Sequence, residues 1–136
     1  MKLNHDCIRS VLLYLESESK VEVGDNGRIR WSEVPIQEFY KALPEYSKED
    51  IYYSLFNIDE AGYINSSCNH AGGSVTMYCV NRITFQGHEF LETIRDDKRW
   101  NKVKSILSSV KDYSLSAISA IAEGITTAAI HSHFEN

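Results

Sequence analysis

The fold is decided by the stretch YSKEDIYYSLFNIDEAG, residues 46–62. Ser47 suits a helix N-cap, because its hydroxyl can accept hydrogen bonds from the first turn, and Asp50 can complete a capping box. Gly62 stands where a left-handed C-terminal cap is expected. The apolar residues between these caps recur at the spacing of one helix face: Ile51, Leu55 and Ile58. The stretch therefore predicts a capped amphipathic helix.

The segments on either side predict a helix before this one and a hairpin after it. Pro35 and Pro44 bracket a run with apolar residues at helical spacing, which ends three residues before the Ser47 cap, as in a helix-turn-helix. Residues 63–68 and 75–83 are two β-prone runs joined through glycines. They predict a wing. Thr84 then caps a further helix, whose predicted buried side is Phe85, Phe90, Leu91 and Ile94.

The chain opens with a helical stripe over residues 4–16, followed by a change of period in residues 20–31. A three-residue loop with Gly27 left-handed would pair Val23 with Ile29 and Val21 with Trp31. A two-residue turn would mix the two faces of the ribbon. Because a one-residue slip reverses every side chain, we predict the three-residue loop.

Two further helical stripes follow, the first over residues 100–110 and the second over residues 115–130. The predicted fold class is thus α+β and mainly helical: a winged helix-turn-helix with an extra N-terminal β-hairpin and one or two C-terminal helices. We expect residues 1–136 to form a single domain, with a core over 1–96 and a helical extension over 97–136. The segment 115–130 either completes the monomer or forms a homodimer.

Composition limits the classes of partner. The chain has a net charge of −5 and a pI near 5.5, whereas proteins that neutralise DNA phosphates usually carry a basic stripe. The N-terminus lacks the apolar core of a secretion signal, and no run is long and apolar enough to span a bilayer. We therefore expect a cytoplasmic protein of a bacterial host cell, with reduced cysteines and no membrane partner.

The outward face of the 46–62 helix predicts the candidate partner-binding residues. Rotation by about 100° per residue, with the apolar stripe inward, leaves two carboxylates, two rings and an amide outside: Glu49, Tyr53, Phe56, Asn57 and Glu60. Exposed aromatic rings among acidic groups are typical of a protein-binding surface and unfavourable for DNA. The alternative interpretation is that the last helix covers Tyr53 and Phe56.

The cations gather elsewhere. Four of them are the candidate nucleic-acid contacts: Arg82, Arg95, Lys98 and Lys102. Arg82 lies in the predicted wing, and the other three lie in the run that precedes and enters the 100–110 stripe. A charge run of this kind more often marks a solvated helix surface.

We predict neither an enzyme nor a cofactor or metal site, because no phosphate loop, nucleophile elbow or paired-carboxylate motif occurs. Cys68, His70 and Cys79 could approach one another across the wing, but they lack C-x-x-C spacing and a fourth ligand. If Gly73-Ser74 forms the turn, Cys68 and Cys79 are expected to be two facing buried thiols.

Several motifs resemble a family of small phage and prophage proteins catalogued as a domain of unknown function: MKLNHDCIR at residues 1–9, YSKEDI at 46–51, EAGYI at 60–64, and IT at 83–84 with GHEFL at 87–91. They occur in that family's order over roughly residues 1–110. The resemblance implies a bacterial or phage origin and carries over no catalytic residues. The predicted function is a non-enzymatic phage or prophage accessory or regulatory protein that binds a host or phage protein, in host takeover or anti-defence. The alternative is a DNA-binding transcriptional regulator of winged-helix type.

Overall fold

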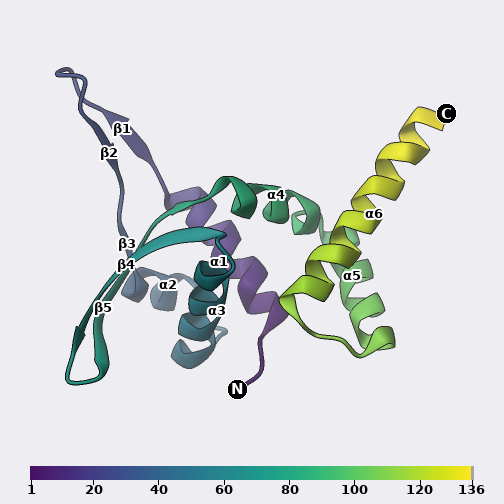
Figure 1. The fold of residues 1–136 in the computed structure, drawn as a ribbon, viewed down its shortest axis with the longest axis horizontal. Helices are drawn as coiled ribbons and strands as arrows, with labels where there is room; N and C mark the ends of the chain where they lie inside the picture. Colours follow the sequence, from purple (N-terminus) through teal and green to yellow (C-terminus); the bar gives the residue numbers. More distant parts are fainter. Residues whose placement is uncertain (136) are drawn as a thin grey trace. The chain divides into compact units, whose positions relative to one another are not determined.

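In the computed structural model, which describes residues 1–135, the chain forms an α+β fold of six helices and five strands (Figure 1). The side chain of Glu135 lies outside this description. Two compact units are present, Met1–His88 and Glu89–Asn136. The fold is mainly helical, as predicted.

The core of the first unit is the contact between α1 (His5–Glu18) and α3 (Lys48–Glu60). The buried stripe of α3 is the predicted one, and α1 meets it with an apolar stripe of its own: Cys7, Ile8, Val11, Leu12 and Leu15. Ser54 is the buried polar residue of this core and hydrogen-bonds the Cys7 side chain. Burial raises the pKa of the Cys7 thiol, so this thiol stays protonated at neutral pH.

The caps that define α3 and the helix after the wing are confirmed. The Ser47 hydroxyl accepts a hydrogen bond from the Asp50 N–H at 3.1 Å, and Gly62 adopts a left-handed φ of 81°. Thr84 Oγ1 accepts from the Gly87 N–H at 3.1 Å, which caps α4 (Phe85–Ile94). The Thr84 N–H also donates to the Tyr63 carbonyl at 2.9 Å. This hydrogen bond joins the start of α4 to the loop between α3 and β4.

The wing is a long hairpin of β4 (Ile64–Ala71) and β5 (Ser74–Ile83), with Gly72 and Gly73 at its turn. A two-residue strand, β3 (Val34–Pro35), pairs with β5 along the edge that faces away from β4. The result is an antiparallel sheet in the order β3-β5-β4. β3 pairs only with Val80 and Cys79, and the chain then turns into α2 (Ile36–Ala42). Figure 1 shows the hairpin continuing beyond β3 to its turn.

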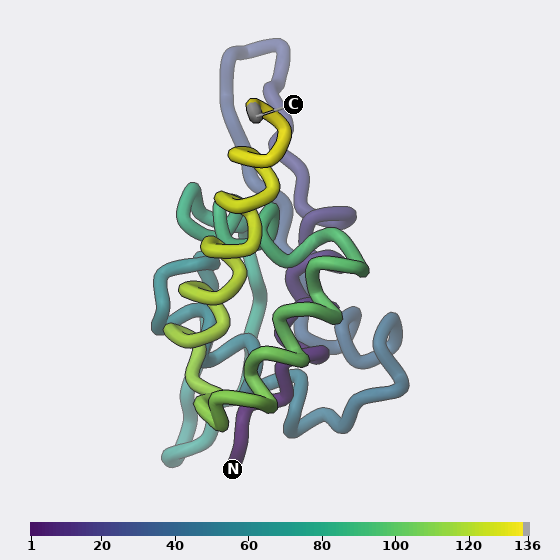
Figure 2. The backbone as a smooth tube through the Cα atoms, turned by 90° about the vertical axis from the view of Figure 1, so that its right-hand side faces the viewer, coloured from purple at the N-terminus to yellow at the C-terminus, as the bar shows by residue number. Residues whose placement is uncertain are grey.

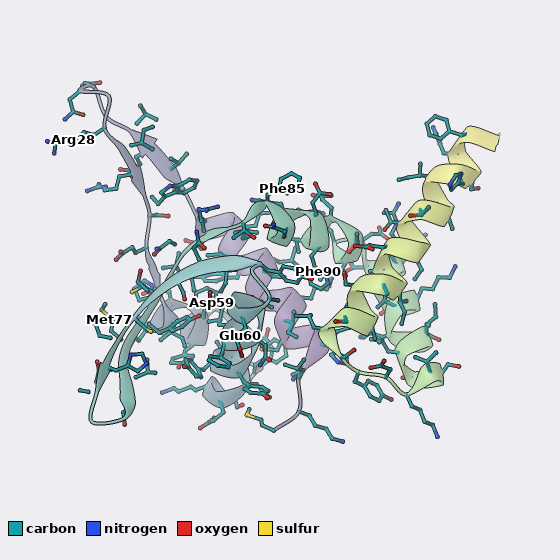
Figure 3. The ribbon with its side chains drawn as sticks, viewed as in Figure 1. Arg28, Asp59, Glu60, Met77, Phe85 and Phe90 are labelled. Atoms are coloured by element: carbon teal, nitrogen blue, oxygen red, sulfur yellow. The ribbon has the colours of Figure 1, made fainter. Side chains whose placement is uncertain are left out.

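The N-terminal hairpin has the predicted register. β1 (Val21–Val23) pairs with β2 (Ile29–Trp31), with Val23 opposite Ile29 and Val21 opposite Trp31, and Gly27 has a φ of 80°. The hairpin is a separate two-stranded sheet. Figure 3 places Arg28 at its tip.

The second unit contains α5 (Asp97–Val110) and α6 (Leu115–Glu135), which pack together along part of their length. Their buried residues are Trp100, Val103 and Leu107 on α5 and Ile118 and Ala122 on α6. Figure 2 shows the C-terminal part of α6 running well past the N-terminal end of α5. Ile130 and Phe134 in this part of α6 are exposed. Among the described helices, none is both long and apolar enough to cross a bilayer.

One prediction about α4 is wrong. Phe90, Leu91 and Ile94 are buried, but Phe85 is 74% exposed. Phe85 precedes Ile94 by nine residues, which at about 100° per residue places the two side chains on opposite helix faces. Figure 3 shows Phe85 and Phe90 on opposite sides of α4.

Gly87 explains how α4 can lie close to the wing. A Cβ on Gly87 would meet the Tyr63 carbonyl oxygen at 2.0 Å and Ile83 Cγ2 at 2.6 Å. We expect Gly87→Ala to lower the free energy of unfolding by about 1–3 kcal/mol, since the backbone must shift to admit the methyl group. Urea denaturation of the full chain measures this.

The matched control is Gly124→Ala in α6, where an added Cβ meets nothing within 4 Å. Alanine in this helix interior should raise stability by about 0.5–1 kcal/mol. Equal effects of the two substitutions would contradict the close approach at Gly87.

Candidate functional site

A groove of about 460 Å³ lies between α2, α3 and the wing strand β5 in the first unit. Its lining is apolar, aromatic and hydroxylic, without a charged side chain: Ile36, Gln37 and Tyr40 from α2, Tyr52 from α3, and Ser74, Val75, Thr76, Met77 and Tyr78 from β5. This volume is within the range of small ligand pockets, which are mostly apolar and carry a few polar groups. The groove is thus a candidate binding site.

Aromatic rings form its inner wall. Tyr52 packs edge-to-face on Tyr78 with ring centroids 5.5 Å apart, and its ring is tilted by 31° against that of Phe56, with centroids 6.2 Å apart. The Lys48 ammonium lies 5.4 Å from the centroid of the Tyr40 ring, which is the geometry of a cation–π contact. Rings held in this way lose little conformational entropy on binding and act as rigid contact surfaces.

Tyr78 is fixed by a small polar network at the end of α3. Its hydroxyl donates to Asp59 Oδ2 at 3.4 Å, and the Ser66 hydroxyl donates to the same oxygen. Burial raises the pKa of Tyr78 well above the usual range for tyrosine, and the nearby Asp59 carboxylate raises it further. Asp59 therefore ties α3 to both strands of the wing and holds one wall of the groove.

The pKa of Tyr40 is also affected by a nearby carboxylate, that of Glu49. Partial burial of Tyr40 raises this pKa, and the negative charge of Glu49 adds to the effect. Glu49 and Asp59 thus place negative potential at two of the rings that line the groove. Of the cations on α2 and α3, Lys48 covers Tyr40, and Lys41 pairs with Glu38 at 3.7 Å.

The predicted partner-binding residues all lie on α3, and three of them form what we call the open side of this helix: Glu49, Phe56 and Glu60. Glu49, Phe56 and Glu60 are exposed, and Phe56 joins the aromatic cluster through Tyr52. Tyr53 and Asn57 are half-buried, and the Asn57 amide is occupied in a 2.7 Å hydrogen bond to the Tyr53 carbonyl. Within the first unit, no other element covers Phe56 fully, and Tyr53 is only partly covered.

Sequence reasoning missed Tyr40, Tyr52 and Tyr78, which line the groove. A signal was present for one of them, because Tyr52 and Phe56 are four residues apart and share a helix face. No periodicity could indicate that Tyr78 lies next to Tyr52, since that contact depends on how the wing folds over α3.

The predicted cationic residues are divided between the two units, with Arg82 in the first and the other three in the second. Arg82 lies 5.6 Å from the centroid of the Trp31 ring, and it donates from Nη2 and Nε to the Asn65 side-chain oxygen at 2.8 and 3.1 Å. Arg82 thus secures the N-terminal hairpin to the wing. Arg95 forms an ion pair with Glu92 at 2.9 Å, whereas Lys98 and Lys102 are exposed on α5.

The cysteines of the wing are not a facing pair. Cys68 is exposed and opposes Tyr78, while Cys79 is buried and opposes Ser67. The turn is at Gly72-Gly73 and not at Gly73-Ser74, and the register shift between Asn69 and His70 moves the pairing by one residue. The expectation of two facing buried thiols is therefore wrong. Over residues 1–135, no three His, Cys, Asp or Glu side chains are grouped closely enough to hold a metal ion.

Sequence comparison identifies the family. The model of a family described as "Hypothetical protein (DUF2513)" matches residues 2–114. The chain belongs to this family. The matched region includes every element of the groove and ends just before α6.

A relative from Haemophilus influenzae (strain ATCC 51907 / DSM 11121 / KW20 / Rd), described as "Uncharacterized protein", is 32% identical over 126 residues. The alignment covers 92% of this chain and 95% of the relative, so both units have counterparts there. No solved structure matches the chain.

The environment of Tyr78 predicts a stability loss at high pH. A tyrosine whose pKa is higher in the folded than in the unfolded chain contributes stability below the unfolded pKa of about 10, and this contribution is lost as the pH rises above that value. We expect Tyr78→Phe to flatten the decline of the unfolding free energy between about pH 9.5 and pH 11.5. Urea denaturation across this range measures the slope.

Tyr113→Phe is the control, because Tyr113 is half-exposed. It should leave the wild-type slope unchanged. A Tyr78→Phe protein with the wild-type slope would show that Tyr78 is not protected from ionisation by the fold.

Proposed function

We propose that this family member is a non-enzymatic accessory protein that binds another protein through the groove and the open side of α3. The observation that carries this proposal is the aromatic groove beside α3, bordered by an acidic surface. Residues 36–60, which form α2 and α3, contain six acidic and two basic residues. Aromatic anchors in a concave site are the features that concentrate binding energy at protein interfaces.

We further propose that the scaffold is a winged helix-turn-helix. The order α1, β3, α2, α3, β4, β5 and the sheet order β3-β5-β4 support this assignment, because a winged helix combines three helices with a three-stranded antiparallel sheet ending in a hairpin. In a DNA-binding member, α3 would enter the major groove. Here Glu49 and Glu60 are exposed on α3, and their carboxylates would be repelled by phosphates.

The biological setting that fits is a phage or prophage gene product acting on a host or phage protein, in host takeover or anti-defence. This part of the proposal is supported by the motif resemblance at residues 1–9, 46–51 and 87–91. A DNA-binding regulator is the competing function, since helix-turn-helix folds most often bind DNA, but a fold does not determine function.

Capture from a bacterial lysate on the immobilised full chain tests protein binding. We expect Phe56→Ala to reduce the amount of a retained protein about tenfold, which corresponds to the loss of a moderate hot spot. Phe85→Ala is the matched control, because Phe85 is also an exposed phenylalanine but lies on α4. It should leave retention unchanged. A protein retained equally by wild type and Phe56→Ala would contradict the proposed surface.

Fluorescence anisotropy with a labelled duplex tests the competing function. We expect no binding at low salt. Binding with a steep negative slope of log affinity against log salt would identify phosphate contacts and replace the proposal with a DNA-binding role.

A further inference from the structure

The groove borders an unpaired edge of the wing sheet. Five consecutive residues of β5, Ser74 to Tyr78, line it. Because successive side chains of a strand point to opposite faces, a hollow that touches five in a row runs along the strand's edge and not over one face. The walls of the groove are thus the edge of a strand on one side and the side chains of α2 and α3 on the other.

This edge is open because β3 is short. β3 pairs with Val80 and Cys79 only, so over the described residues no strand lies beside residues 74–77 on that side. Pro35 ends β3 and begins the turn into α2, which carries the chain away from the sheet. The gap left beside β5 is the groove.

Sheet edges are normally protected from pairing by charges, prolines or cover from another element. Residues 74–77 are Ser-Val-Thr-Met, with neither a charge nor a proline, and all four are exposed. The register shift between Asn69 and His70 leaves Thr76 of β5 without a register partner on β4, and this bulge increases the local twist of β5. Val75 and Thr76 are β-branched residues, which favour a strand.

The charges around the groove favour a basic occupant. Glu49 and Asp59 act on Tyr40 and Tyr78, while both cations of α2 and α3 are already engaged with a ring or a carboxylate. A Lys or Arg side chain entering the groove would meet negative potential and the faces of aromatic rings, both of which attract cations.

We propose that the groove binds an extended segment of a partner protein, five or six residues long, which adds as a strand to the edge of β5 and carries at least one Lys or Arg. This inference rests on the proposed protein-binding function and specifies the class of partner. Five residues of a strand span about 17 Å, and main-chain hydrogen bonds to the edge supply affinity while the groove selects side chains.

A phage-displayed library of random twelve-residue peptides, selected on the full chain, supplies the probe. Selected peptides should be enriched in Lys or Arg among β-branched residues. The decisive measurement is an N-methyl scan of the tightest peptide, in which one backbone N–H at a time is methylated. In an added strand every second N–H faces the sheet, so we expect losses of about tenfold or more at alternate residues and small changes at the others.

Gln37 provides variants that leave the fold intact, because it lines the groove but is exposed on α2. Gln37→Arg should weaken binding of the basic peptide about two- to fivefold and Gln37→Glu should strengthen it similarly, with both effects reduced at high salt. Phe85→Ala should bind as wild type does.

Each failure has a distinct meaning. A library that yields no binder, or a binder whose N-methyl scan shows no alternation, overturns strand addition. The proposed function then still stands if Phe56→Ala reduces capture of a lysate protein about tenfold, as expected above. A peptide that alternates in the scan but is insensitive to both Gln37 variants overturns the basic specificity, and a binder that Phe85→Ala also loses overturns the location.

Discussion

The contact between α1 and α3 sets the geometry of everything near the groove. Burial of Ile51, Leu55 and Ile58 against α1 fixes the rotation of α3 about its own axis. Once that rotation is fixed, Tyr52 and Asp59 must lie toward the wing, and Glu49 and Glu60 must lie in solvent. Burial of three aliphatic side chains is worth several kcal/mol, far more than any of the surface contacts that depend on it.

Local signals were sufficient for elements whose ends and faces are determined by neighbouring residues. The Ser47, Gly62 and Thr84 caps and the register of the N-terminal hairpin follow from side chains a few positions apart, and the structure confirms them. β3 escaped prediction because two residues contain no period. It exists because Val80 and Cys79 of β5, some 45 residues away in the chain, offer a partner.

The candidate site was predictable only in part. The helix wheel identified α3 as the element that presents acidic and aromatic groups, but it could not show which flank of α3 meets the wing. Tyr52 and Tyr78 come together through a contact between a helix and a strand 26 positions apart in the chain. The sequence did not indicate that the Arg82 guanidinium lies over the ring of Trp31, because Trp31 belongs to a different sheet.

The cysteines offer a practical consequence. Cys7 and Cys79 are buried, and burial raises the pKa of both thiols, whereas Cys68 is exposed on β4 directly across from Tyr78. Since thiolates react and buried thiols resist ionisation, a maleimide dye should attach to Cys68 selectively in the native, unmutated chain. Such a dye would sit on β4, which pairs with the groove strand β5 on the side away from the groove, and its emission can report changes at Tyr78 in real time.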